Sequence, residues 1–293
     1  MSPRSPLLPI VIALIGIASF GVMDGLMKVA TLALGAYGAM FWRNMAGTLI
    51  MLPVWLRRGN GWPKRESMKL HLLRSAISGV LATLFFYGLA RTPIGEAMAL
   101  TFIAPLIALY LAAFLLGETV SRRAVIGSLI GLVGVMVIAI GKFSGNYTAE
   151  SIQGLIALLV SATLYAWYLV LQRQQSQIAC PEEIAFFQTF LVFCMLGIGA
   201  WWFAPPPALG DWRVLIGSAV LSLSSLMLLS WAYARAEAQV LVPLEYTGFI
   251  SAALFGWLVF NEELTWRTMF GATLIVAGCL LASRRDEPHL EPV

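Results

Sequence analysis

The sequence predicts an all-α integral membrane protein with ten transmembrane helices, arranged as two inverted five-helix repeats. Three observations predict this class. The composition is strongly apolar, the apolar residues fall into blocks of about 20 residues, and one part of the chain repeats the pattern of another.

Hydrophobic residues make up 59% of the chain and charged residues 12%, with a mean hydropathy of +0.83. Soluble domains average roughly 45–50% apolar and 25% charged residues, so this chain has too little polar surface to cover a water-soluble core. A helix of about 20 apolar residues spans the roughly 30 Å of bilayer hydrocarbon. The alternating segments of about ten residues that are typical of membrane barrels do not occur in the sequence.

The stretch from Leu84 to Gly141 matches the stretch from Leu228 to Arg285 without a gap, 144 residues further along. Identical pairs at this offset are Arg91 and Arg235, Glu118 and Glu262, Arg123 and Arg267, Gly127 and Gly271, and Gly134 and Gly278. A separate region shares the offset, because Ile12-Ala13-Leu14 matches Ile156-Ala157-Leu158. The chain is therefore predicted to be a tandem duplication.

Proline, glycine or charged residues separate ten apolar blocks. In chain order the blocks are Leu7–Val29, Gly35–Leu56, Leu70–Ala90, Ile94–Leu116, Ala124–Gly141, Gln153–Gln172, Glu183–Phe203, Arg213–Ala234, Ala236–Phe260 and Thr268–Ser283. The first block resembles a signal peptide, but it continues past any cleavage site and is needed to match the sixth. Five helices per copy is an odd number, so the second copy enters the membrane inverted. The predicted domains are repeats over residues 7–141 and 152–283, with a cytoplasmic tail over residues 284–293.

Basic residues gather on one predicted side of the membrane, and short cytoplasmic loops are the ones that retain Lys and Arg. With the N-terminus inside, the cytoplasmic residues are Arg4, Arg57, Arg58, Lys64, Arg65, Lys69, Arg74, Arg122, Arg123, Arg173, Arg235, Arg284 and Arg285. We therefore expect a multi-pass protein of the cell (inner) membrane with both termini cytoplasmic. The segment from Arg57 to Arg74 is read as a solvated loop or a contact for anionic lipids. The net charge of +4 reflects insertion topology and does not indicate a nucleic-acid partner.

Several short motifs carry a resemblance to a known family. They are Pro105, Leu116-Gly117-Glu118, and Gly127 with Gly134 in the first half, Asn261-Glu262, Gly271 and Gly278 in the second half, and Arg43 in the second block. With these motifs the chain resembles the EamA family of the drug/metabolite transporter superfamily. The resemblance implies a ten-helix carrier of small metabolites, with a cavity lined by the first four helices of each repeat and the fifth and tenth as scaffold. Phe249 stands where Pro105 does, and Asn261 replaces Gly117, so the two half-sites need not be equivalent.

Glu245 is the main candidate site residue, because an ionisable side chain inside an apolar block is expensive in hydrocarbon and normally faces protein or water. It follows Pro243, which removes a backbone donor and tends to break the helix, and it precedes Tyr246. Its counterpart in the first half is Thr101. The functional interpretation is a contact for a substrate ammonium group or a proton-coupling carboxylate. The alternative is a carboxylate bonded to a neighbouring helix for packing.

A charged cluster is predicted in the first half. Asp24 and Lys28 are four residues apart on one helix face, and Arg43 lies at a comparable depth beside Asn44. Arg43 is read either as the anchor of a substrate carboxylate or phosphate or as the partner of Asp24 in an internal salt bridge. Lys28 is read as a residue near a helix end whose amine reaches the membrane interface. At the equivalent positions of Asn44 and Asp24, the second half has Gln188 and Tyr168.

Aromatic residues are dense in the second half. Tyr168, Trp167 and Trp231 are candidates to line a pocket, where they could stack on a ring or a cation. The residues near helix ends are read as an interfacial belt, namely Trp201, Trp202, Trp212 and Trp266. Glu96 is read either as a contact to the N-terminal dipole of the fourth helix or as a gate, whereas Glu118 and Glu262 are read as structural. Gly127 and Gly131 form a small-residue packing face, either within the chain or between the protomers of a homodimer.

The sequence predicts a secondary transporter, as an exporter or exchanger of small polar metabolites such as amino acids, nucleobases or related compounds. Access to a cavity near the bilayer midplane would alternate, with protons as a candidate coupling ion. The alternative is an intramembrane lipid-handling protein or enzyme. An enzyme is disfavoured because there is no His-Glu-x-x-His motif and no Cys/His pairing within the predicted helices, and direct use of ATP is disfavoured because there is no phosphate-binding loop. His71 is placed at a loop edge and His289 in the tail, so no catalytic residue, cofactor or metal site is predicted.

Overall fold

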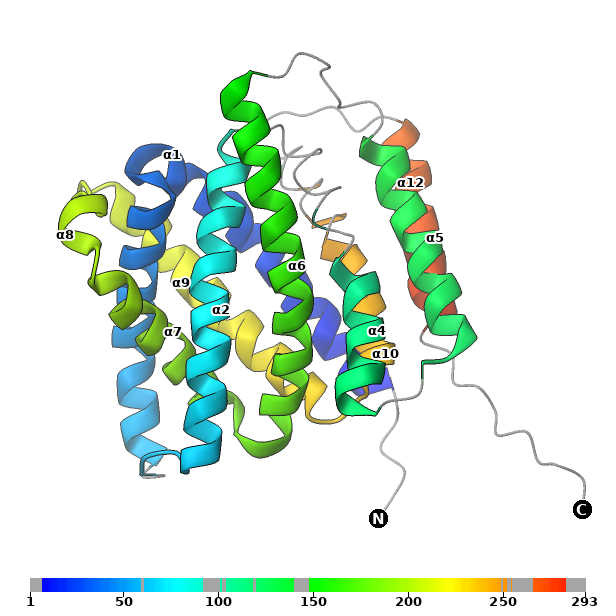
Figure 1. The fold of residues 1–293 in the computed structure, drawn as a ribbon, viewed down its shortest axis with the longest axis horizontal. Coiled ribbons are helices and arrows are strands. Elements are labelled where there is room, and N and C mark those ends of the chain that lie inside the picture. Colours follow the sequence, from blue (N-terminus) through cyan, green and yellow to red (C-terminus); the bar gives the residue numbers. More distant parts are fainter. Residues whose placement is uncertain are drawn as a thin grey trace, which may run out of the picture.

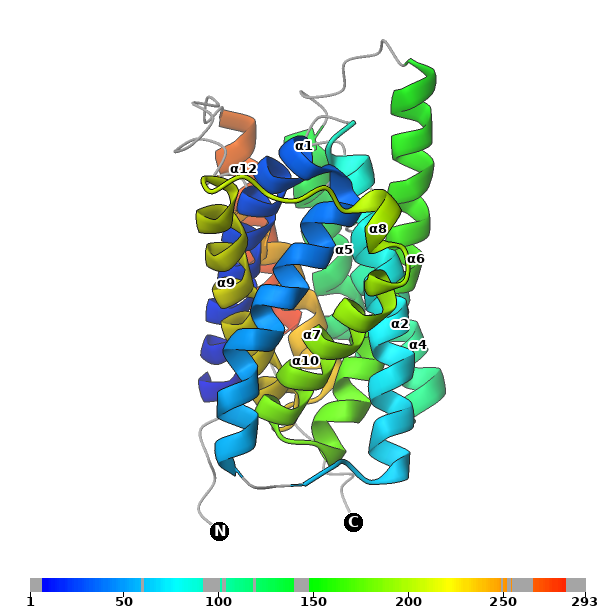
Figure 2. The same ribbon diagram turned by 90° about the vertical axis from the view of Figure 1, so that its left-hand side faces the viewer.

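The computed structural model describes residues 7–58, 61–91, 104–117, 120–139, 148–248 and 266–282, together with residues 101, 250, 251 and 254. All regular secondary structure in this part of the chain is helical, which confirms the predicted all-α class. Figure 1 and Figure 2 show the helices packed side by side as a bundle, with their axes inclined to one another.

The longer helices are α1 (Leu7–Arg58), α2 (Arg65–Leu89), α6 (Ala149–Ile178) and α9 (Asp211–Tyr233). Shorter helices are α4 (Ala104–Leu116), α5 (Arg122–Ala139), α7 (Pro181–Gly197) and α12 (Trp266–Ala282). The remaining short elements are α8 (Ala200–Phe203), α10 (Ala238–Leu241) and the 3₁₀ helix η1 (Val242–Thr247). Within the described ranges, four helices are long and apolar enough to cross a membrane: Leu7–Arg57, Arg65–Leu89, Ile152–Ile178 and Asp211–Tyr233.

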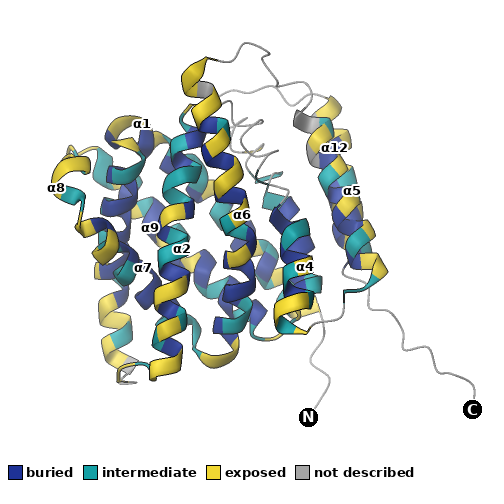
Figure 3. Ribbon diagram, in the orientation of Figure 1, coloured by how far each residue is buried: buried dark blue, intermediate teal, exposed yellow. Residues whose placement is uncertain are grey.

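The faces of the bundle that point outward carry large apolar side chains. Phe114 on α4, Met269 on α12 and Ile15 on α1 are exposed, and Figure 3 shows buried residues concentrated between the helices. Exposed apolar patches of this extent would promote association in water, whereas lipid tails solvate them. The surface therefore agrees with the membrane class that composition predicts.

The first two predicted blocks form one element, α1, which changes direction at Gly35. Gly35 has φ 72° and ψ 160°, a conformation that glycine adopts without the steric cost of a Cβ atom. In Figure 1 the dark-blue first half of α1 rises from the N-terminal end and the paler second half descends beside α7. The boundary predicted at Gly35 is therefore a sharp turn between two helical segments.

The predicted seventh helix, residues 183–203, is divided into α7 and α8. The Tyr37 hydroxyl donates a hydrogen bond to the Leu196 carbonyl at 2.5 Å, near the end of α7. A Cβ atom at Gly199 would lie 2.6 Å from that hydroxyl oxygen. The missing side chain at Gly199 thus lets a tyrosine from α1 reach the helix end, which an apolar pattern alone does not indicate.

Helices α5 and α12 pack backbone to backbone. A Cβ atom at Gly127 would lie 2.4 Å from the Gly278 carbonyl oxygen, and one at Gly134 would lie 2.6 Å from the Gly271 carbonyl oxygen. Because the contacts pair residues in reverse order, the two helices run antiparallel (Figure 1). Gly131 faces the ring of Tyr246. The glycine face predicted on α5 therefore packs within the chain.

The ends of α2 and α9, which are equivalent at the 144-residue offset, share local structure. The Arg91 guanidinium lies 3.6 Å from the centre of the Tyr87 ring, and the Arg235 guanidinium lies 3.9 Å from the centre of the Trp231 ring. Each arginine also donates a hydrogen bond to the carbonyl of that aromatic residue. Two equivalent helix ends thus use the same cation–π contact.

Candidate functional site

A cavity of about 180 Å³ lies in the middle of the bundle. A buried water needs only about 10–15 Å³ by a comparable measure, so the cavity has room for a small solute. Its described lining comes from α1, α2, α4, α6, α7, α9 and the region of η1, and none of it from α5 or α12. Its polar and charged lining residues are Asp24, Arg43, Asn44, Ser78, Thr101, Ser161, Tyr165, Tyr168, Gln172, Gln188, Thr189, Ser222 and Glu245.

The 3₁₀ helix η1 brings Glu245 to this cavity. Pro243 lies at the start of η1 and supplies no backbone N–H, so the regular α-helical ladder is interrupted where the sequence predicts a break. Glu245 is 7% exposed. Its Oε2 accepts a hydrogen bond from the Tyr165 hydroxyl at 2.9 Å, while its Oε1 has no hydrogen-bond partner among the described residues. One carboxylate oxygen is thus held by α6, and the other is buried without a described hydrogen-bond partner.

Two glutamines also have polar atoms without a described hydrogen-bond partner. The Gln188 Oε1 on α7 and the Gln172 Nε2 on α6 are buried without a hydrogen-bond partner in the described part of the chain. A buried polar atom left unsatisfied costs roughly 1–3 kcal/mol, so such atoms are rare without a reason. Here both residues belong to the cavity lining, so the unsatisfied atoms are on side chains that a solute in the cavity would contact.

The charged cluster predicted in the first half also reaches the cavity. Asp24, Arg43 and Asn44 all line it. The Arg43 Nη1 contacts the Met23 sulfur at 3.4 Å, and the Asn44 amide donates to the Met40 carbonyl at 2.7 Å. Asp24 and Arg43 attract one another electrostatically, but no direct ion pair joins these two described residues. Arg43 therefore keeps donors for an anionic group.

Three candidate residues do not line the cavity. Trp167 is 44% exposed on the outer face of α6. Tyr246 is buried against Gly131 of α5. Trp231 is half-buried, with Arg235 over its ring. Of the predicted site residues, the structure thus brings together Asp24, Arg43, Asn44, Thr101, Tyr168, Gln188 and Glu245.

Arg74 is the main residue that sequence reasoning misplaced, since it was grouped with the cytoplasmic loop. It is completely buried on α2. Its guanidinium donates to Gln175 Oε1 at 2.5 Å, to the Tyr168 hydroxyl at 2.6 Å and to Gln172 Oε1 at 3.0 Å. It also lies 4.3 Å from the centre of the Tyr168 ring. Its position inside the third apolar block was the signal that could have identified it.

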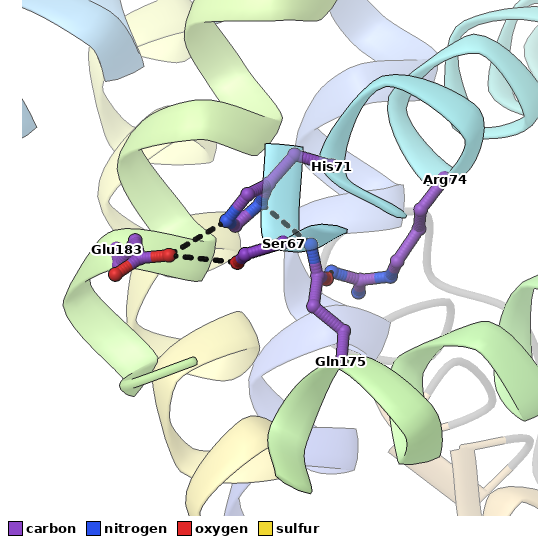
Figure 4. Close-up of polar contacts among 5 residues, drawn as sticks. All are labelled: Ser67, His71, Arg74, Gln175 and Glu183. Carbon is purple, nitrogen blue, oxygen red and sulfur yellow. Dashed lines mark hydrogen bonds and ion pairs between the residues drawn. The ribbon is translucent and has the colours of Figure 1, made fainter. Parts of the chain in front are cut away.

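His71 is likewise buried on α2, so its predicted place at a loop edge is wrong. Figure 4 shows it between Gln175 and Glu183. The His71 Nε2 lies 2.9 Å from Glu183 Oε1, and the Gln175 Nε2 lies 2.6 Å from His71 Nδ1. The Ser67 hydroxyl donates to the same Glu183 oxygen at 3.1 Å. A continuous polar network therefore runs from the beginning of α7 through α2 and α6 to the cavity lining.

Tyr165 and Gln172 were also absent from the predicted site. They share the inner face of α6 with Tyr168, because positions three and four residues apart on a helix lie on one side. The spacing of Tyr165, Tyr168 and Gln172 was therefore a usable signal. To use this signal, one of the three residues first had to be assigned to the cavity.

Comparison with known proteins agrees with this architecture. The model of the EamA-like transporter family matches residues 7–140 and 152–284. A pseudopaline exporter of Pseudomonas aeruginosa is 29% identical over 278 residues, which cover 94% of this chain and 95% of the exporter. A riboflavin transporter of Brucella anthropi is 25% identical over 254 residues, covering 84% and 87%. A crystal structure with 20% identity has the same fold, with a TM-score of 0.76 over 93% of this chain and 95% of the other.

Proposed function

The chain belongs to the EamA-like transporter family, and from this premise we propose a secondary carrier that exports or exchanges small polar metabolites. Amino acids, nucleobases and related compounds are the solute class. Family membership and the matched relatives make the protein a multi-pass membrane transporter rather than an enzyme. The solute class and the transport mechanism are what we propose for this chain.

The observation that carries the proposal is a set of unsatisfied polar atoms on side chains that line the cavity. Glu245 Oε1 and Gln188 Oε1 are buried acceptors and Gln172 Nε2 is a buried donor, each without a hydrogen-bond partner among the described residues. Arg43, at the same cavity, has only a thioether contact for its Nη1. A solute with both donors and acceptors would satisfy these atoms, and Glu245 would favour an ammonium or amidine group over a neutral donor.

We propose that the cavity alternates its access between the two sides of the membrane. The mechanism rests on two inverted repeats, residues 7–141 and 152–283, because two halves of one shape and opposite orientation give two nearly equivalent packings. The antiparallel α5–α12 contact supports this arrangement, since Gly127 contacts Gly278, the counterpart of Gly134, and Gly134 contacts Gly271, the counterpart of Gly127, as two repeats related by a pseudo-twofold axis would. The shared arginine–aromatic contact at the ends of α2 and α9 supports it too.

The proposed location is the cell (inner) membrane, with both termini cytoplasmic and residues 284–293 forming a tail. The first turn of α1 and the last turn of α12 lie toward the same end of the bundle, which supports termini on one side (Figure 1). Membrane lipids surround the chain in this proposal. Protons are the proposed candidate for a coupling ion, through a buried acidic side chain in the cavity.

Uptake into proteoliposomes, with a panel of labelled amino acids, nucleobases and vitamins, tests the solute class. Transport of at least one polar solute above empty liposomes is the expected result. Accumulation that follows an imposed pH gradient would support proton coupling, and indifference to the gradient would indicate facilitated exchange. Movement of fluorescent phospholipids with no transport of any solute would replace the proposal with lipid handling.

A further inference from the structure

Arg74 is buried with neutral partners only, among the residues that the structure describes. Its hydrogen-bond acceptors are two glutamine oxygens and a tyrosine hydroxyl, and Glu183 is reached only through Gln175 and His71. A guanidinium group has five N–H donors and no acceptor. Every group in contact with Arg74 must therefore turn an acceptor atom toward it.

This requirement fixes the orientation of the cavity lining on α6. Gln172 presents its Oε1 to Arg74, so its amide Nε2 must point elsewhere, and that nitrogen is buried without a described partner. Tyr168 presents its hydroxyl oxygen to Arg74, so its own O–H proton must also point elsewhere. Both residues line the cavity.

The hydrogen bonds that link Glu183, His71 and Gln175 fix the same orientation from the Glu183 end of the network. A carboxylate accepts hydrogen bonds only, so His71 donates to Glu183 from Nε2 and must accept from Gln175 at Nδ1. Gln175 then donates through its Nε2 and accepts from Arg74 through its Oε1. Every hydrogen bond along this path therefore has its donor on the Arg74 side and its acceptor on the Glu183 side. Figure 4 shows the side chains of the path.

We infer that Arg74 is a positioning residue for solute specificity. It binds the acceptor atoms of Gln172 and Tyr168 and leaves their N–H and O–H donors for the cavity, so that the α6 side of the cavity is a donor surface. The solute group bound there is an acceptor, with a carboxylate favoured because charge-assisted hydrogen bonds are the stronger ones. Glu245 and Gln188 line the same cavity, and each has a buried acceptor atom without a described hydrogen-bond partner. The inferred solute class is a zwitterion that carries both an ammonium and a carboxylate group. This inference rests on the proposed function and narrows it.

The sharpest test is Gln172→Glu, which is close to isosteric. A glutamate keeps an oxygen toward Arg74 and replaces the unpartnered Nε2 donor of this lining residue with an acceptor. Proteoliposomes are assayed with the amino acids that the wild type transports, and each amino acid is compared with its decarboxylated amine. We expect the wild-type preference for the amino acid, as a ratio of kcat/KM values, to fall at least tenfold in Gln172→Glu, mainly through KM.

A matched variant separates solute polarity from added charge. Gln153→Glu adds the same charge at an exposed position of α6 and should keep the wild-type preference for the amino acid. An unchanged preference in Gln172→Glu, or an equal loss in Gln153→Glu, would overturn the inference.

Thermal unfolding gives a readout that needs no solute. Gln172→Glu supplies Arg74 with a counter-charge, so its Tm should equal or exceed that of the wild type, whereas Gln172→Leu should lower it. If the wild type transports no member of the panel, the proposed solute class fails by itself. A Tm of Gln172→Glu below that of Gln172→Leu would then overturn the orientation inferred for this network.

Discussion

Glu245→Gln tests the centre of the proposed site. The substitution keeps the size of the side chain, and an amide can still bond to the Tyr165 hydroxyl that now holds Oε2. It removes the negative charge of a carboxylate that lines the cavity and whose Oε1 has no hydrogen-bond partner among the described residues. Hydrogen bonds to charged groups contribute about 1.5–3 kcal/mol, which corresponds to a loss of roughly 10- to 150-fold in affinity.

The assay is concentration-dependent uptake into proteoliposomes, with the amount of reconstituted protein normalised. We expect Glu245→Gln to raise KM for an ammonium-bearing solute by at least tenfold, or to abolish transport where protonation of Glu245 is part of the cycle. Glu66→Gln is the matched control, since Glu66 is exposed in the first turn of α2. Tyr165→Phe keeps the carboxylate and should change KM by less than Glu245→Gln does. Wild-type uptake by Glu245→Gln would refute the assignment of Glu245 to the solute.

The other predictions concern Arg43, the α5–α12 contact and the Glu183–His71 pair. Arg43→Ala should reduce kcat/KM at least tenfold for a carboxylate-bearing solute, whereas Arg57→Ala should have no effect; normal uptake by Arg43→Ala would remove this residue from the site. Gly127→Ala should lower Tm, because overpacking against the Gly278 backbone costs about 1–3 kcal/mol. KM should stay unchanged, because Gly127 does not line the cavity. Gly217→Ala is its control, since the nearest atom would lie 3.5 Å away; equal Tm values for the two variants would contradict the close packing. Glu183→Ala leaves the buried His71 Nε2 without its acceptor and should destabilise the protein by about 1–3 kcal/mol, more than Ser67→Ala does, as measured by thermal unfolding; the reverse order would show that the His71 contact matters less than the Ser67 contact.

The sequence predicted the class of the fold and part of the site for one physical reason. Ionisable residues are costly in hydrocarbon, so Glu245, Asp24 and Arg43 were conspicuous inside apolar blocks. Pro243 predicted the interruption of the helix at Glu245, because proline lacks the donor that the helix needs. The second apolar block was predicted to begin at Gly35, but the reversal there was not predicted; it depends on a positive φ that glycine adopts without steric cost.

Other parts of the site depend on which side of a helix faces inward. Trp167 and Tyr168 are adjacent, yet Tyr168 contacts Arg74 and Trp167 faces outward. In a soluble protein, the polar face of a helix would indicate which residues face outward. Lipid tails are as apolar as a protein core, so that signal is weak here. Arg74 was missed for a related reason, since its charge was assigned to the adjacent basic loop.

The contact between α5 and α12 has a mechanical consequence. Gly127 and Gly278 bring two main chains together with no side chain between them, and so do Gly134 and Gly271. A backbone contact of this kind contains no side chain that can change its rotamer. The close packing is lost if one helix slides along the other by one residue. The interfaces of α1, α2, α6, α7 and α9 around the cavity contain long side chains that can adopt other rotamers. We therefore expect the conformational changes of the transport cycle to take place in those interfaces, while α5 and α12 move as one rigid pair.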